Sequence, residues 1–72
     1  MASVNADWAM RREMKLARRR AGLSQREMAE RMGTKHSVIA RLEQGRSLPT
    51  IKTLRRIAQV TGSRLVVRLK AE

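Results

Sequence analysis

The chain has 72 residues, with 17 Lys or Arg against 6 Asp or Glu, so its formal net charge is +11 at pH 7. It contains no Cys and one His, which excludes disulfides, thiolate chemistry and His-based metal clusters within one chain. A single domain of this size buries only about 60% of the surface that its unfolded form exposes, so support from a second copy is expected. The charge density favours an acidic partner such as a nucleic acid.

The apolar and aromatic residues indicate where we expect the protein to be located and which kind of nucleic acid is favoured as its partner. No apolar run approaches the roughly 20 residues of a membrane span, and residues 1 to 10 lack the order of a secretory signal, so we expect a cytoplasmic protein without a membrane partner. Trp8 is the only aromatic residue, and it can either pack on the edge of the core or lie at a partner surface. Proteins that bind single-stranded nucleic acid usually stack bases on aromatic rings, so duplex DNA is the favoured partner.

The first predicted helix covers residues 7 to 21, follows a flexible start over residues 1 to 6, and ends before Gly22. Its apolar stripe recurs at spacings of four and three, at Met10, Met14, Ala17 and Ala21. The other faces are basic and carry Arg11, Arg12, Lys15, Arg19 and Arg20. These cations are interpreted either as a solvated face or as contacts to phosphate.

Two short helices joined by a glycine turn are predicted over residues 24 to 45. The first begins at Ser24, because Ser24 and Glu27 have the spacing of a capping box, and Gly33 ends it. The second opens on small polar and basic side chains and ends at Gly45. The residues expected to face the core are Met28, Ala29, Met32, Val38, Ile39 and Leu42. This arrangement is typical of a helix-turn-helix, which places the start of its second helix against DNA.

A fourth helix and a strand are predicted after Pro49, which disfavours helix in the residue before it. Thr50 is the expected N-cap of a helix that runs to about Thr61 and turns Ile51, Leu54, Ile57 and Ala58 inward. After Gly62 the apolar residues change from a helical to an alternating pattern, so residues 64 to 70 are predicted to form a strand. No second strand is predicted, and the simplest partner for its backbone is the same segment of another copy. We expect a homodimer joined through Leu65, Val66, Val67, Arg68 and Leu69, the alternatives being a frayed tail or a fifth short helix.

Residues 16 to 58 resemble the Cro/cI-type (Xre) helix-turn-helix family, the lambda-repressor-like domain, in the ordered pieces LSQ, MAERMG, VIARLEQG and LPT. The resemblance implies an all-α, lambda-repressor-like four-helix domain over residues 7 to 62, with a short C-terminal β-strand in residues 63 to 72 for dimerisation. The segment TGSRLVVRL further resembles the tail of HipB-like and HigA-like antitoxins, whose C-terminal strand pairs across a dimer.

The resemblance also implies roles for individual residues. Gln25 stands where the family has a residue that contacts the DNA backbone. Arg18 and Glu43 match a pair that forms a salt bridge between the first and third helices, the alternative being two solvated charges. The family's base-facing positions correspond to Lys35, His36, Ser37, Ala40 and Arg41. Because family members often have a Ser or Thr cap where Lys35 stands, the third helix is expected to be capped by Thr34 or by water.

The chemistry of these side chains agrees with DNA binding. Lys35 and Arg41 can donate to guanine, and Ala40 can meet a thymine methyl. His36 can donate or accept, and with Arg41 it is the expected specificity residue, the alternative for His36 being a phosphate donor. Three further phosphate contacts are expected beside the start of the fourth helix, where a cation opposes the helix dipole: Arg46, Ser47 and Lys52.

We therefore expect a sequence-specific repressor that binds a palindromic double-stranded operator as a homodimer. Two biological roles stay open: an antitoxin that represses its own operon and has a cognate toxin partner, or a stand-alone phage, plasmid or accessory-operon regulator. The short segment before the first helix argues against contact with a toxin. A protein-interaction module is a third possibility. An enzyme is not expected, because Glu27 and Glu30 fit a cap and a solvated face and no catalytic set, metal site or cofactor motif is present.

Overall fold

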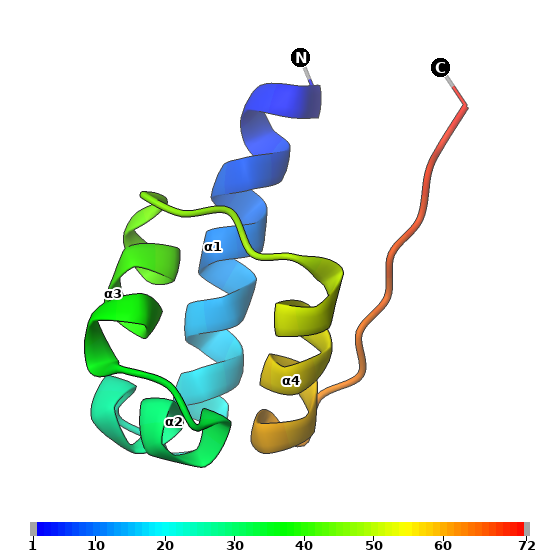
Figure 1. Ribbon diagram of the computed structural model, residues 1–72. Helices are drawn as coiled ribbons and strands as arrows, with labels where there is room; N and C mark the ends of the chain where they lie inside the picture. Colours follow the sequence, from blue (N-terminus) through cyan, green and yellow to red (C-terminus); the bar gives the residue numbers. More distant parts are fainter. Residues whose placement is uncertain (1, 72) are drawn as a thin grey trace.

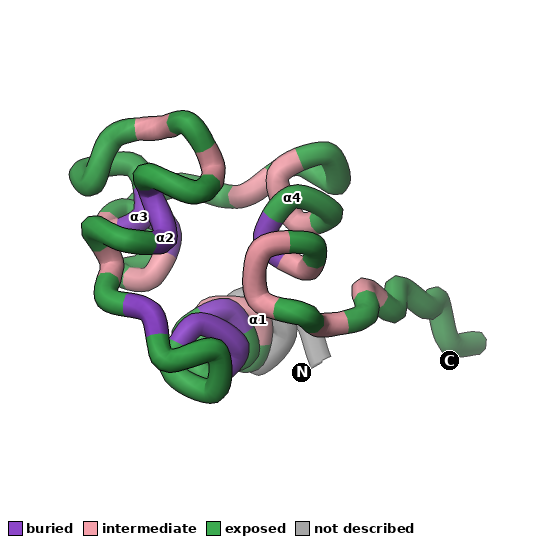
Figure 2. Tube along the Cα trace, turned by 90° about the horizontal axis from the view of Figure 1, so that it is seen from below, coloured by how far each residue is buried: buried purple, intermediate pink, exposed green. Residues whose placement is uncertain are grey.

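Four helices follow one another in the computed structural model, which describes the backbone of residues 2–71 and the side chains of residues 9–71 (Figure 1). They are α1 (Ala2–Arg20), α2 (Gln25–Met32), α3 (His36–Gln44) and α4 (Ile51–Thr61). Helices α2, α3 and α4 lie on one side of α1 (Figure 2). Within residues 2–71, no helix combines the length and the apolar character that a membrane crossing needs.

Short-range side-chain contacts set where the helices begin and end. The Ser24 hydroxyl accepts from the Glu27 N–H at 3.0 Å, and the Glu27 carboxylate accepts from the Ser24 N–H at 2.8 Å. The Thr50 hydroxyl accepts from the Thr53 N–H at 3.1 Å and so caps α4. The C-caps of α2, α3 and α4 are glycines in the left-handed region, where a side chain would be strained: Gly33, Gly45 and Gly62. The predicted capping box, the Thr50 cap and the glycine ends are confirmed.

One predicted helix start is wrong, and one of the two caps expected for the third helix is excluded. Helix α1 begins at Ala2, earlier than the predicted start near Asp7, and residues 2–6 contain neither Gly nor Pro to prevent it. The N-cap of α3 is Lys35, which makes no side-chain cap, so Thr34 does not fill that role. The proposed positions of the Trp8 side chain lie outside the described residues.

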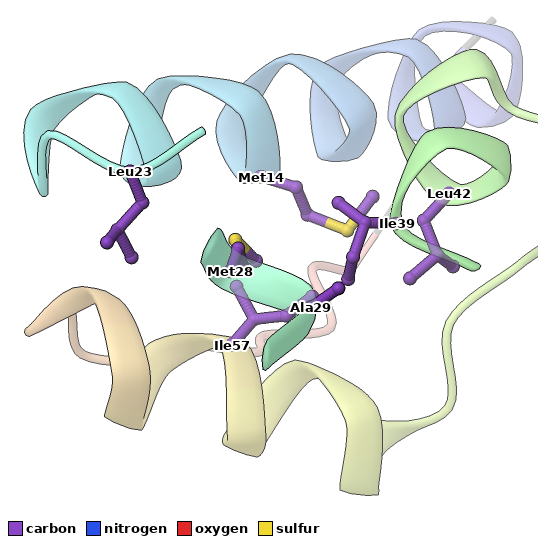
Figure 3. Packing of buried hydrophobic residues seen from close by; sticks show 7 residues of the cluster. All are labelled: Met14, Leu23, Met28, Ala29, Ile39, Leu42 and Ile57. Carbon is purple, nitrogen blue, oxygen red and sulfur yellow. The ribbon is translucent and has the colours of Figure 1, made fainter. Parts of the chain in front are cut away.

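The core lies between the helices and is built from one or two side chains of each, together with Leu23 from the connection between α1 and α2. Its buried apolar residues are Met14, Leu23, Met28, Ala29, Ile39, Leu42 and Ile57 (Figure 3). Met28 and Ile39 are each only 1% exposed, so the helix pair α2–α3 is held by side chains that water does not reach. Ala21, Val38 and Ile51 were expected to face inward and are exposed instead, because they lie at the end of α1 and on the margins of α3 and α4.

The C-terminal residues run beside α4 as an extended tail (Figure 1). Over residues 63–71 this tail forms neither helix nor strand, so the strand predicted over residues 64–70 is absent from the single chain. The physical reason is that a strand needs a ladder partner, and residues 2–71 contain no other strand. Val66, Val67 and Leu69 are 64%, 60% and 100% exposed.

Candidate nucleic-acid interface

The turn between α2 and α3 is closed by backbone hydrogen bonds around Gly33. The Gly33 N–H donates to the Glu30 carbonyl at 3.1 Å, and the Thr34 N–H donates to the Ala29 carbonyl at 2.9 Å. These two bonds form a Schellman motif, which stops α2 and redirects the chain within a few residues. The buried face of α3 then lies against α2, and its other face is left open to solvent.

Four of the five residues predicted to contact bases lie in α3, and the fifth, Lys35, is its N-cap. Lys35, His36, Ser37 and Arg41 are exposed, and Ala40 is half-buried. No side chain caps α3, although the Val38 N–H of its first turn donates to the Lys35 carbonyl at 3.0 Å, so only the N–H groups of His36 and Ser37 remain for an acceptor outside the protein. The only acidic residue of α3, Glu43, is turned inward, with 5% of its side chain exposed. The outward face of α3 is therefore basic.

A bidentate ion pair fixes α3 against α1. Arg18 Nε donates to Glu43 Oε2 at 2.7 Å, and Arg18 Nη2 donates to Glu43 Oε1 at 3.0 Å. The remaining Arg18 nitrogen, Nη1, donates to the Leu23 carbonyl at 2.8 Å, just before α2. Arg18 thus connects α1 to α3 and to the segment just before α2, and its pair with Glu43 is the one that the family resemblance implied.

Gln25, at the start of α2, is used inside the protein. Its Nε2 donates to Glu43 Oε1 at 3.1 Å, and its Oε1 lies 3.0 Å from His36 Nε2. Sequence reasoning assigned Gln25 to phosphate and missed this link, because the link depends on the angle at which the turn sets α3 against α2. The phosphate contact of Gln25 stays a prediction, and its side-chain amide is already bonded on both sides.

Arg11 holds the C-terminal end of α3, which the sequence did not indicate. Arg11 Nη1 donates to the Gln44 carbonyl at 3.0 Å, where a cation meets the negative end of the helix dipole. A Cβ on Gly45 would come within 2.6 Å of Arg11 Cδ. The glycine therefore serves both the left-handed turn, at φ 77°, and the close approach of Arg11.

The predicted phosphate contacts lie beyond α3. Arg46 and Ser47 are exposed in the loop to α4, and Lys52 is exposed in the first turn of α4. Lys52 also lines a groove of about 480 Å³ between the α2–α3 turn and α4, together with Arg55 and Arg56. No acidic residue lines this groove. Basic side chains therefore continue from the open face of α3 across the loop to α4.

The helix-turn-helix family model (HTH_3) matches residues 14–67, which is most of the chain. The chain belongs to this helix-turn-helix family. Members of the family are DNA-binding regulatory domains of the Xre (Cro/cI) type, and the protein is a DNA-binding transcription regulator. No curated protein and no solved structure matches the chain.

Within the matched region, α2 and α3 are the two short helices joined by a tight glycine turn. In this motif the second helix enters the major groove and the first crosses the DNA backbone. In the helix-turn-helix protein described here, that second helix is α3, whose solvent-facing side is basic and whose other side belongs to the core.

Proposed function

We propose that this helix-turn-helix protein is a sequence-specific repressor that binds a palindromic double-stranded operator as a homodimer. One observation carries the proposal: α3 presents a solvent-facing row of side chains able to read bases, while Ile39 and Leu42 anchor its other side in the core. A helix fixed in this way can hold the row in one register along the major groove.

The row has the chemistry of direct readout. Arg41 and Lys35 donate to guanine O6 and N7, Ser37 bonds to several base edges, and Ala40 contacts a thymine methyl. The exposed basic and hydroxyl side chains after α3 supply phosphate contacts, which set orientation but do not read sequence. We assign that second role to Arg46, Ser47 and Lys52.

The proposed dimer forms through the tail. Three apolar side chains of the tail are largely exposed, and its backbone has no ladder partner within residues 2–71. A groove of about 540 Å³ lies between the tail, α1 and α4, and its apolar lining includes Met10, Leu54 and Leu65. Pairing of two tails would satisfy the backbone and cover these side chains. A two-fold operator requires the two α3 helices of such a dimer to lie about 34 Å apart, on successive major grooves.

The dimer is tested by its oligomeric state. We expect sedimentation of the wild-type chain at micromolar concentration to give twice the monomer mass. Val67→Asp/Leu69→Asp, which puts two charges in the proposed ribbon, should give monomers. Arg64→Asp/Lys70→Asp carries two acidic substitutions on the alternate positions and should keep the dimer. A monomeric wild-type chain at these concentrations would contradict this part of the proposal.

For the biological role, we propose an autoregulating antitoxin of a toxin–antitoxin operon, supported by the similarity of TGSRLVVRL to antitoxin tails. The test is co-expression with the product of the adjacent reading frame, followed by copurification and measurement of operator affinity. A stable complex that changes operator affinity supports the antitoxin. A neighbour that neither binds nor changes repression supports the alternative of a stand-alone regulator.

Operator binding is tested by footprinting on the DNA just upstream of the protein's own gene. We expect a two-fold symmetric footprint, and about a tenfold or greater loss of affinity for Arg41→Ala. Arg19→Ala removes the same charge from an exposed position at the end of α1 and is the matched control. If Arg41→Ala and His36→Ala impair capture of a protein partner and leave DNA affinity unchanged, the protein-interaction alternative is correct.

A further inference from the structure

A continuous chain of side-chain hydrogen bonds runs from buried Arg18 to exposed His36 at the start of α3. It passes from Arg18 to Glu43, from Glu43 to Gln25, and from Gln25 to the imidazole. From it we infer that neutral His36 presents a bare Nδ1, a hydrogen-bond acceptor, to DNA and thereby selects adenine or cytosine at the position it contacts. This inference rests on the proposed function and names a base preference within it.

The first step is the state of Glu43. Both of its oxygens accept from the Arg18 guanidinium, at 2.7 and 3.0 Å, and 5% of its side chain is exposed. An ionised carboxylate accepts hydrogen bonds and donates none. Glu43 therefore offers only an acceptor to its next neighbour, Gln25.

The second step is the orientation of the Gln25 amide. When the amide nitrogen of Gln25 faces Glu43, it donates to Glu43 Oε1 at 3.1 Å. The reversed amide would place two acceptor oxygens against each other at that distance, with no proton between them. Glu43 therefore forces the amide oxygen of Gln25 toward His36, whichever way the amide would turn in isolation.

The third step is the tautomer of His36. The Gln25 oxygen lies 3.0 Å from His36 Nε2, so Nε2 must carry the proton that this bond needs. A neutral imidazole has one N–H and one bare nitrogen, so Nδ1 is left as the acceptor. His36 is the first residue of α3 and is exposed, so a base edge can approach its ring.

The last step is the code of the major groove. In the major groove, adenine N6 and cytosine N4 are hydrogen-bond donors, whereas guanine and thymine present acceptors. An acceptor such as Nδ1 can therefore bond to adenine or cytosine but not to guanine or thymine. An imidazole locked with a bare Nδ1 therefore favours A or C over G or T on the contacted strand. Without the lock, the ring can exchange tautomers and donate to guanine. Arg18, Glu43 and Gln25 are thus positioning residues for His36 and need not touch DNA themselves.

The experiment selects binding sites from a pool of random duplexes at about pH 8, where imidazole is ordinarily neutral. The selection is run with the wild-type chain, His36→Ala, Gln25→Met and Gln59→Met. The position whose preference disappears in His36→Ala is the one that His36 contacts. We expect wild type to favour A or C there over G by about tenfold. Gln25→Met should reduce that ratio to near one and leave the other positions unchanged. Gln59→Met, at an exposed position of α4, should select the same sequences as wild type.

The outcomes separate the inference from the proposed function. If no sequence is enriched by the wild-type chain, the repressor proposal fails. If sites are enriched but the His36 position favours G or T, or His36→Ala alters no position, or Gln25→Met keeps the A or C preference, only the inference fails. A second measurement needs no variant: the chain has one His, so its ring ¹⁵N signals are unambiguous. A proton on Nδ1 of the neutral His36 ring, measured in the protein without DNA, would also overturn the inference.

Discussion

Arg18 is the residue on which the geometry of the interface most depends. It connects α1 to Glu43 of α3 and to the Leu23 carbonyl before α2, and it is 8% exposed. Removing one partner of a buried pair costs more than the pair contributes, because the other charge stays behind without a counter-ion. Arg18 is therefore important for stability as well as for the position of Gln25 and His36.

We predict that Arg18→Met lowers the free energy of unfolding by about 3 kcal/mol, because it leaves Glu43 charged and buried. Urea unfolding at neutral pH measures this. The exposed neighbour gives a matched control, Arg19→Met, which should change stability by less than about 0.5 kcal/mol. Arg18→Met/Glu43→Met should recover much of the loss, since the stranded charge is gone. Equal effects of the two single variants would contradict the buried-charge argument.

A second residue-scale prediction concerns acid. The Ser24 backbone N–H donates to the Glu27 carboxylate and holds the pKa of Glu27 below its usual range, with the Ser24 hydroxyl and Arg31 acting in the same direction. A carboxyl whose folded pKa is lowered stabilises the fold above its unfolded pKa, near about 4.3, and loses that contribution as the pH falls through the folded value.

We therefore expect Glu27→Gln to melt at a lower temperature than wild type at neutral pH, and the gap to close as the pH falls below about 4. Thermal melts across this range provide the measurement. Glu30→Gln removes the same charge from α2 outside the capping box and controls for net charge. A gap that stays constant down to the lowest pH would show that the ionised carboxylate is not what stabilises the cap.

A side-chain hydrogen bond could be predicted from the sequence when its two partners lie close together in the chain. The Ser24–Glu27 box and the Thr50 cap were predictable, because their partners are three residues apart and the bonds require only a helix start. The Arg11 bond to Gln44 spans 33 residues and depends on how α1 and α3 pack. The link from Gln25 to His36 spans 11 residues and depends on the turn geometry. Only the Arg18–Glu43 pair was found across such a distance, and a family resemblance supplied it.

At the scale of elements, α3 differs from its neighbours in how it begins. Helices α2 and α4 have side-chain caps, whereas the N-cap of α3 is a lysine that makes none. A cation at a helix N-terminus opposes the dipole and costs stability. The same placement brings a positive charge to the end of α3 that is proposed to meet DNA.

This contrast predicts opposite effects of one substitution. Lys35→Ser should raise the free energy of unfolding by about 0.5 to 1 kcal/mol, by adding a cap, and should weaken operator binding, by removing a proposed contact. Urea unfolding and a gel shift measure the two effects. Lys15→Ser, on an exposed face of α1, removes the same charge without adding a cap. If Lys35→Ser gains stability and binds the operator as tightly as wild type, Lys35 does not contact the operator.

The elements themselves were predictable to the extent that each is fixed by its own residues. Helices α2 and α4 match the expected ranges, because a capping residue and a glycine bound each of them. The start of α1 was misjudged, since residues 2–6 contain two residue types that often cap helices, Ser3 and Asn5, and neither Gly nor Pro to stop a helix. The alternating pattern of the tail describes what residues 64–70 favour, but a strand also requires a second backbone, which one chain does not provide.

At the scale of the whole molecule, acidic side chains are scarce in the segment proposed to contact DNA. Residues 35–56 contain Lys35, Arg41, Arg46, Lys52, Arg55 and Arg56 and only one acidic residue, the ion-paired Glu43. Such a surface binds DNA largely through release of condensed counter-ions, so affinity should fall linearly with salt on logarithmic axes, with a slope of about −0.9 per phosphate contacted. The slope therefore measures the number of phosphates contacted, and the change in slope for a single substitution shows whether that residue contacts a phosphate.

We predict that Lys52→Ala weakens binding by a similar factor for all operator sequences and makes the salt slope shallower by about one per subunit, or about two per dimer. A phosphate carries no sequence information, so base preferences should not change. Fluorescence anisotropy titrations between about 50 and 200 mM salt give the slope. Lys15→Ala is the matched control, and its slope should equal that of wild type if the exposed face of α1 does not contact DNA. An unchanged slope for Lys52→Ala would take α4 out of the proposed contact surface, whereas a changed base preference would show that Lys52 reaches a base edge.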